Sequence, residues 1–549
     1  MILIILRVFV DIGYRIWLFL PWIFLVVHLI PYLVDRYHIR RNGITGPSLA
    51  RFSDAWLGWV VANGRQSEVV HEMHKKFGPV VRLAPNHVSI SDPGALHVIY
   101  GHGSGLLKSG YYEPFTAVRP SIFSTRSREV HSKKRKIISH VFSQKSVLEF
   151  EPFVHLHLAE LFEHWDKMCD GGKEGLSGTE SEGGWKRRGG QAWFDIMPWF
   201  NYLAFDIIGD LAFGSPFGMV RNAKDAAPIA VDRKSAMAQY GPVITDNRGL
   251  EKPVIDVREV HAISVLENRM RLSAQMGVLP AWWRPIVRQL PRFAQGVQNS
   301  KDLVDLAVAA VAKRMAYPTQ RDDILSKLQQ SRDEYGRPLT QEDLTTDAIT
   351  QLVAGSDTIS ISSCGIAYHL AANPDVQSKL QKEIDDALGG FDDPMVTYAQ
   401  IKHLQYLEAV INEGLRVHPT PGLGLPRVVP EGGLNVCGKW FPEGTILSVP
   451  TYTIHRNTGV WGEDANVFRP ERWFEGDQAA MQKVFNAFSF GPRACIGRNL
   501  AMMELYIIIA SIFHRYELIL EEPNKPLEIH EAFMRKPVAC HVGLKRRGA

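Results

Sequence analysis

Residues 488–497 read Phe-Ser-Phe-Gly-Pro-Arg-Ala-Cys-Ile-Gly and combine one cysteine with an arginine and two glycines. Gly491 and Gly497 allow the backbone to turn tightly and to approach a neighbour where a Cβ atom would collide. A cysteine in such a turn is suited to be the axial ligand of haem iron, and a thiolate ligand favours cleavage of the O–O bond of bound dioxygen. Arg493 can hold a haem propionate through charge-assisted hydrogen bonds. The loop predicts haem-thiolate chemistry, with Cys495 as the metal ligand.

The positions of Phe488, Gly491, Arg493, Cys495 and Gly497 resemble the haem-binding signature of the cytochrome P-450 family. A structural cysteine in an ordinary glycine turn is the alternative interpretation. The resemblance implies heme b as the cofactor. It also implies the cytochrome P-450 fold, which is mainly α with a small β portion.

A second candidate group is Ala-Gly-Ser-Asp-Thr at 354–358, inside a long stretch with helical spacing of apolar residues. Gly355 weakens a helix by ~1 kcal/mol relative to alanine, and a helix widened there can admit water or a ligand. Asp357 and Thr358 place a carboxylate and a hydroxyl in one turn. A helix glycine beside a surface acid is the alternative. Because the segment resembles the oxygen-activation motif of the family, Asp357 and Thr358 are the candidate catalytic residues for proton delivery.

Glu413 and Arg416 are three residues apart and therefore neighbours on one face of a helix. Such a pair is usually exposed and contributes little to stability. Apolar neighbours on both sides favour partial burial here. The resemblance implies that Glu413, Arg416 and Arg472 form a structural triad behind the cysteine loop.

Further cations are expected to neutralise the haem propionates. His131 and Arg135 lie four apart on one helix face, and Arg427 follows Leu-Pro in an extended stretch. The family usually has tryptophan where this chain has His131, and histidine can still donate a hydrogen bond. We therefore expect His131, Arg135, Arg427 and Arg493 to bind the cofactor. The lysines at 133, 134 and 136 form either a solvated face or a basic surface that steers an acidic electron donor.

Composition excludes several classes of protein. The chain has 549 residues, 45% of them hydrophobic, and a formal charge of +4, which is too small to indicate a nucleic-acid partner. Its five cysteines are an odd number without zinc-like spacing. Free thiols fit a reducing compartment.

The N-terminus predicts a membrane anchor. Residues 16–34 are nineteen residues without Asp, Glu, Lys or Arg, close to the ~20 needed to cross a hydrocarbon core. Arg36, Arg40 and Arg41 follow and favour the cytosolic side. A cleaved signal peptide is the alternative, but no small-residue cleavage site follows. We expect an anchor with its basic flank at 1–41 and one large catalytic domain at 42–549, in the endoplasmic reticulum membrane and facing the cytosol.

Outside these groups, residues 80–85 and 87–90 predict strands, and 445–449 is a further strand-like run. Residues 170–191 are rich in glycine and charge and predict a solvated loop. Residues 192–209, 340–369 and 404–417 predict helices. The glycine-rich segment 101–105 lacks the strand and helix context of a dinucleotide loop. Electrons are therefore expected from NADPH through a separate NADPH–cytochrome P-450 reductase.

Several stretches resemble one fungal branch of the family, the benzoate para-hydroxylases; they include 74–78, 100–103, 108–109, 201–214, 425–427, 448–456 and 535–537. Residues 220–290 fit that branch less well, and Ile359 stands where a second threonine is common. The resemblance implies a monooxygenase of a small aromatic substrate such as benzoate. An aromatic or polyketide intermediate of fungal secondary metabolism is the alternative substrate.

Pocket residues are predicted by position only, and each also fits an ordinary core. Arg119 is the candidate partner of a substrate carboxylate. The other candidates come from the loop before the His131 helix, from the turn before Gly355 and from later segments: Tyr111, Tyr112, Phe115, Val118, Leu352, Val353, Ala354, Leu423, Leu425 and Phe533.

Two other classes of function remain open, one catalytic and one non-catalytic. A reductase-independent isomerase or dehydratase of the same fold would rearrange a peroxide without a proton relay, which the pairing of Asp357 with Thr358 disfavours. A non-catalytic haem-binding protein would not need the complete set of motifs. A requirement for NADPH separates the first alternative from a monooxygenase.

Overall fold

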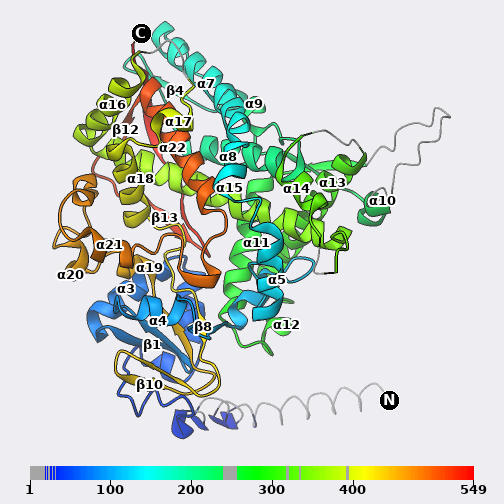
Figure 1. The fold of residues 1–549 in the computed structure, drawn as a ribbon, viewed down its shortest axis with the longest axis vertical. Coiled ribbons are helices and arrows are strands. Elements are labelled where there is room, and N and C mark those ends of the chain that lie inside the picture. The colour runs from blue at the N-terminus through cyan, green and yellow to red at the C-terminus, as the bar shows by residue number, and fades with distance from the viewer. Residues whose placement is uncertain are drawn as a thin grey trace, which may run out of the picture.

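A computed structural model describes residues 19, 21–22, 25–26, 29–30, 32–238, 256–316, 321–332, 335–390 and 395–548. The long helix α15 (Gln341–Ala372) lies near the centre of the molecule (Figure 1). Other long helices are packed around it: α7 (Glu151–Glu174), α8 (Ile196–Phe213), α11 (Ala262–Gly277), α13 (Ala294–Ala316), α16 (Pro374–Leu388), α18 (Gln405–Val417) and α22 (Arg498–Arg515).

Local sequence explains where α15 begins and ends. The Thr340 side chain accepts a hydrogen bond from the backbone N–H of Asp343, which caps the N-terminus. Two acidic residues in the first turn favour that end of the helix. Pro374 then starts α16, and a proline disfavours helical geometry at the residue before it. The helix is mostly buried, and it packs along α8 and α22.

The N-terminal lobe contains a five-stranded sheet, at the bottom of the view in Figure 1. Segments far apart in sequence alternate in it, because the parallel pairing of β11 with β2 brings residues near 447 beside residues near 88. The strand order is β1 (Val80–Ala84), β2 (His87–Ile90), β11 (Ile446–Ser448), β8 (Arg427–Val428) and β3 (Leu107–Lys108). The strands predicted at 80–85, 87–90 and 445–449 are confirmed.

The loop predicted at 170–191 is wrong in part. α7 continues to Glu174, and the chain then forms β4 (Lys186–Arg188) and β5 (Gln191–Asp195) before α8 begins. The partner of β5 is β15 (His541–Arg546), at the far end of the chain, in a four-stranded sheet completed by β12 (Tyr516–Leu520). Because β5 pairs with a strand so distant in sequence, the glycine- and charge-rich segment itself gives no local indication that strands form there.

Shorter elements complete the described structure. Three two-stranded sheets pair β6 (Ala227–Ala230) with β7 (Val257–Val260), β9 (Leu434–Val436) with β10 (Lys439–Phe441), and β13 (Ile529–Glu531) with β14 (Arg535–Pro537). The shorter helices are α2 (Ala55–Ala62), α3 (Gln66–Phe77), α4 (Ala95–Tyr100), α5 (Arg128–Ile138), α6 (Gln144–Leu148), α9 (Met219–Asn222), α10 (Arg233–Ala238), α12 (Arg284–Val287), α14 (Ile324–Gln330), α17 (Tyr398–Ile401), α19 (Thr451–Ile454), α20 (Thr458–Trp461) and α21 (Gln478–Val484).

Nine of the nineteen residues of the predicted span, 16–34, lie outside the described residues. Within the part of the chain that is described, we find no helix with the length and apolar character required to cross a bilayer. The fold is mainly helical with a minor β portion, as the sequence predicts.

Candidate haem-thiolate site

The cysteine loop joins a short 3-10 turn, η6 (Gly491–Arg493), to the N-terminus of α22. The backbone N–H of Cys495 donates to the carbonyl of Phe488 at 2.9 Å, which closes the loop. Burial raises the pKa of the Cys495 thiol, whereas the Gly497 N–H and the charges of Arg135 and Arg498 act to lower it. These last groups stabilise a thiolate, the form that binds a metal.

Gly491 is required by the loop for two reasons. Its φ of +66° lies in the left-handed region, and a Cβ atom there would stand 2.2 Å from the Tyr100 carbonyl oxygen. Gly497 differs, because its Cβ would meet only the Sγ of Cys495, at 4.0 Å. Gly491 thus seats the loop against the end of α4, and a side chain at Gly497 would occupy space beside the thiol.

Replacing Gly491 with alanine is expected to reduce stability and haem content together. The left-handed conformation alone costs about 1–2 kcal/mol, and the overlap with Tyr100 adds to it. Gly103→Ala is the matched control, since Gly103 has φ +80° and nothing within 4 Å of its Cβ position. Thermal unfolding and haem absorbance measure both variants. Equal losses in the two would show that contact with Tyr100 is unimportant.

Five basic side chains gather near the cysteine loop without a carboxylate. His131 and Arg135 come from α5, Arg427 from β8 and Arg493 from the loop, as predicted; Lys108 from β3 joins them and was not predicted. The pKa of His131 is lowered to about 3, first by burial and then by the charges of Arg493, Lys108, Arg135 and Arg427, so its imidazole is neutral at pH 7. No carboxylate of the described residues lies within ion-pair distance of the five.

The three arginines of this cluster bond only to neutral acceptors. Arg493 donates to the Thr125 carbonyl at 3.0 Å, Arg135 to the Ala494 carbonyl at 2.9 Å, and Arg427 to the Tyr112 hydroxyl at 2.8 Å. Arg427 is buried and the other two arginines are half-buried. Burying positive charges without a counter-ion is costly, and an anionic ligand removes that cost. The donor set, a cysteine beside a cation cluster, therefore fits haem with its iron on Cys495 and its propionates on the cations.

Lys108 is buried, like His131 and Arg427 of this cluster. Its ammonium lies 4.4 Å from the ring centroids of both Tyr112 and Phe123, and it donates to the Phe123 carbonyl. Burial, then Arg427 and Arg493, hold its pKa well below the usual range. Lys108 lies in the short strand β3, far from Cys495 in the sequence, so the sequence did not indicate that it is near the cysteine loop.

The central helix carries the predicted oxygen-activation residues. The Thr358 hydroxyl donates to the Ala354 carbonyl at 2.7 Å. Ala354 is exposed although α15 crosses the centre of the molecule, so an open space adjoins this turn. The expected widening at Gly355 is not seen, because α15 is continuous from Gln341 to Ala372. Gly355 instead permits close packing, since a Cβ there would lie 2.8 Å from the Ile208 side chain of α8.

Asp357 is buried and bound to a cation that the sequence did not reveal. Lys536 of β14 lies 3.2 Å from its carboxylate and 2.7 Å from Glu267 of α11. Burial raises the pKa of Asp357, while Lys536 acts to lower it. All three line a cavity with Arg271 and His530, so the Asp357 side chain adjoins that cavity, one residue before Thr358 on α15. A buried carboxylate beside such a cavity can exchange protons with it.

The structure brings the proposed triad together in the core. Glu413 accepts from Arg416 in two bonds of 2.8 Å and from Arg472 in one of 2.8 Å, and all three side chains are buried. The Trp473 indole N–H donates to the same carboxylate at 3.0 Å. Burial acts to raise the pKa of Glu413, but the bonds and charges of Arg416 and Arg472 outweigh it and lower the pKa.

Only some of the predicted substrate residues line the same cavity. A mostly apolar cavity is lined by Phe115, Arg119, Val353, Ala354 and Phe533 of the predicted set. Other lining residues were not predicted: Ala117, Ser121, Phe123, Arg269, Met270, Leu303, Thr346, Ile349, Thr350 and Met534. Aromatic rings and the α15 turn before Thr358 thus share one cavity.

The remaining candidates lie elsewhere. Val118 is exposed, so its predicted role is not supported by its position. Tyr112, Leu352 and Leu425 do not line the apolar cavity; Tyr112 accepts from Arg427 instead. Arg119 forms an exposed ion pair with Glu342, which already neutralises its charge.

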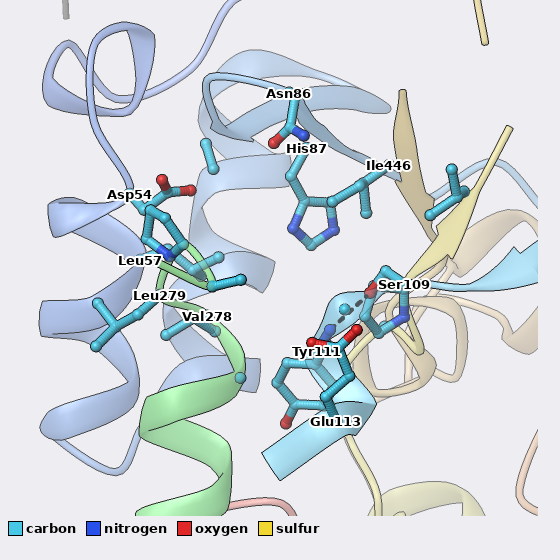
Figure 2. A pocket seen from close by; sticks show the side chains of 18 of the residues that line it. Asp54, Leu57, Asn86, His87, Ser109, Tyr111, Glu113, Val278, Leu279 and Ile446 are labelled. Carbon is cyan, nitrogen blue, oxygen red and sulfur yellow. Dashed lines mark hydrogen bonds between the residues drawn. The ribbon is translucent and has the colours of Figure 1, made fainter. Parts of the chain in front are cut away.

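Tyr111 and Leu423 line a second, more polar cavity. Figure 2 shows Tyr111 and Glu113 of the 3-10 turn η2 (Gly110–Phe115) facing His87 of β2, with Leu279 on a further side. This cavity lies between the N-terminal sheet and the end of α11. Placing Tyr111 and Leu423 in the same pocket as Phe115 was therefore wrong.

Comparisons with known proteins identify the family of this chain. Residues 55–543 match the family model described as cytochrome P-450. A benzoate 4-monooxygenase of Aspergillus niger is 41% identical over 530 residues, which cover 95% of each chain. A cytochrome P-450 monooxygenase of Penicillium roqueforti is 31% identical over 479 residues, 86% of this chain and 88% of the relative. One from Penicillium aethiopicum is 28% identical over 518 residues, 92% and 93% of the two chains.

Proposed function

Because this chain belongs to the cytochrome P-450 family and is a haem-thiolate monooxygenase, we propose that it hydroxylates a small aromatic acid such as benzoate. The observation that carries the proposal is the apolar cavity, in which Phe115, Phe123 and Phe533 accompany the α15 turn before Thr358. The similarity to a benzoate 4-monooxygenase supports the same substrate class.

Haem bound through Cys495 supplies the reductive activation of dioxygen and the cleavage of its O–O bond. The residues of this chain have separate tasks around it. The cation cluster holds the propionates, and the aromatic cavity holds the substrate and excludes water. Asp357 takes protons from the polar cavity beside Lys536, and the Thr358 hydroxyl passes them toward the site of oxygen chemistry. Positioned proton transfer of this kind contributes about 10²–10⁴-fold in rate.

The electron donor and the membrane belong to the same proposal. We infer that electrons come from NADPH through a separate reductase, and that residues 16–34 anchor the enzyme in the endoplasmic reticulum membrane with the catalytic domain in the cytosol. The apolar composition of that stretch and the arginines after it support the anchor. The exposed Lys136 of α5 supports docking of an acidic donor near the cysteine loop.

An optical titration of the ferric enzyme with benzoate tests the substrate class. Substrate that displaces water from the iron converts it from low to high spin. A saturable shift is expected, followed by hydroxylation that requires NADPH and reductase. Without a shift at any concentration, the larger aromatic or polyketide intermediate becomes the favoured substrate. Turnover of a peroxide without NADPH would indicate the isomerase or dehydratase class.

Replacing Thr358 with alanine is expected to uncouple the reaction. NADPH consumption should continue while the yield of hydroxylated product per NADPH falls, by about tenfold if one hydrogen bond of ~1.5 kcal/mol to the reacting oxygen is lost. Thr345→Ala is the control, because Thr345 makes the same bond on α15, to the Gln341 carbonyl at 2.8 Å. Product and NADPH are measured together. Unchanged coupling in Thr358→Ala would remove this residue from the proton path.

A further inference from the structure

Arg269 of α11 is a buried cation with no carboxylate partner among the described residues. Its side chain is 6% exposed. Burial and, to a lesser extent, the charge of the nearby Arg288 together lower its pKa to about 10. Burying an unpaired charge costs free energy. A residue of this kind has either a structural task or a ligand that supplies the missing negative charge.

Neutral acceptors satisfy only part of this guanidinium. Nη1 donates to the Pro114 carbonyl at 2.8 Å and to the Ser273 hydroxyl, and Nη2 donates to the Thr116 carbonyl at 3.2 Å. A guanidinium has five N–H donors, so these bonds leave two without an acceptor in the described part of the chain. One of the two is the buried Nε–H.

Arg269 also lines the apolar cavity, where a second buried polar group lacks a partner. The Thr346 hydroxyl oxygen makes no hydrogen bond within the described structure, and its residue is 2% exposed. It lines the same cavity from α15. A guanidinium and a hydroxyl are both donors that carboxylates accept. An apolar cavity with a few converging polar groups is the usual form of a small-molecule site.

We propose that Arg269, together with the Thr346 hydroxyl, binds the carboxylate of the aromatic acid, an inference that rests on the proposed function. The bond replaces the missing counter-ion with the charge of the substrate itself. The bond also orients the ring. When Arg269 holds the carboxylate, C4, the ring carbon farthest from that carboxylate, points away from Arg269. Arg119, the arginine favoured by sequence position, is half exposed and already paired with Glu342.

A purely structural task for Arg269 makes a different prediction. Its bonds to Pro114 and Thr116 tie α11 to the segment that carries Phe115. If that were all, removing the guanidinium would loosen the cavity for every ligand. A carboxylate site loses affinity for the anion alone. The ratio of affinities for benzoate and for benzamide, which has the same shape and no charge, therefore separates the two roles.

The experiment measures both dissociation constants by spin-state titration and by calorimetry on the haem-loaded enzyme. In Arg269→Gln we expect benzoate to bind about 10- to 100-fold more weakly, the loss expected for hydrogen bonds to a charged group, with benzamide changed less than threefold. Arg269→Lys should recover part of the preference for benzoate. Arg288→Gln, which removes a nearby exposed charge, should change neither ligand by more than threefold.

Equal weakening of both ligands in Arg269→Gln, or loss of benzoate preference in Arg119→Gln instead, would overturn the assignment. If Arg269→Gln does not bind haem, Thr346→Val tests the same site and is expected to weaken benzoate about threefold to tenfold; no change there would count against it. If the wild-type enzyme binds benzoate and the variants bind it equally well, the inference fails and the proposed function stands. Absence of benzoate binding in the wild type contradicts the proposed function itself.

Discussion

Replacing Glu413 with alanine is expected to lower the free energy of unfolding by about 3–5 kcal/mol, because it leaves the buried Arg416 without its counter-ion and removes the buried one of the two carboxylates that Arg472 contacts. Arg416 keeps the backbone carbonyls of His455 and Ala465 but no carboxylate. Arg472 keeps the Trp461 carbonyl and the half-exposed Asp464 carboxylate at 3.0 Å. The triad supports the segment before the cysteine loop, so haem content should fall together with stability. Chemical unfolding and haem absorbance measure the two quantities.

The matched control is Glu72→Ala. Glu72 and Lys75 form a pair with the same three-residue spacing, at 2.9 Å, but both side chains are more than half exposed. Exposed pairs contribute about 0–1 kcal/mol. If the Glu413→Ala variant were stable and loaded with haem but inactive, a structural role would be contradicted. Glu413 would then take part in the reaction itself.

The pH dependence of this stabilisation has a definite sign. The pKa of Glu413 in the folded protein lies below its ordinary value of 4.5. Its contribution is therefore complete above pH 4.5 and is lost as the pH falls through the lowered folded value. The difference in stability between the wild type and Glu413→Gln should narrow in acid and stay constant above that pH.

Replacing Asp357 with asparagine is expected to slow hydroxylation by about 10²–10⁴-fold, the range for loss of a positioned proton-transfer group. Binding of benzoate should change little, since Asp357 does not line the apolar cavity. The solvent isotope effect should increase, because proton delivery then limits the rate. Asp347→Asn is the control, since Asp347 is also a buried carboxyl on α15, with a pKa raised by burial to about 6.

Lys536→Met tests the partner of Asp357. Lys536 acts to lower the pKa of Asp357, so its removal should move the titration of Asp357 to higher pH. The pH profile of hydroxylation should shift in the same direction, and the titration should be absent in Asp357→Asn. A profile that does not move in Lys536→Met would show that the lysine has no influence on the proton path.

Local sequence determined a large part of this protein. The cysteine loop could be identified because ligand, arginine and glycines lie within ten residues. The pairing of Glu413 with Arg416 follows from the pitch of one helix. The boundaries of α15 follow from Thr340 and Pro374. In each case the interacting atoms are at most a few residues apart, and the covalent chain already places them together.

Tertiary structure alone decided which charges are paired. Arg119 appeared available for a substrate, but Glu342 of α15 neutralises it at the surface, whereas Arg269 on α11 is buried without a counter-ion. Lys108 joins the cations near Cys495 through pairing of β3 with β8, and Lys536 reaches Asp357 from the β13–β14 hairpin. The burial and the electrostatic environment of a side chain depend on neighbours from the whole fold. Residues of the same type therefore acquire different roles, which a short segment of sequence cannot reveal.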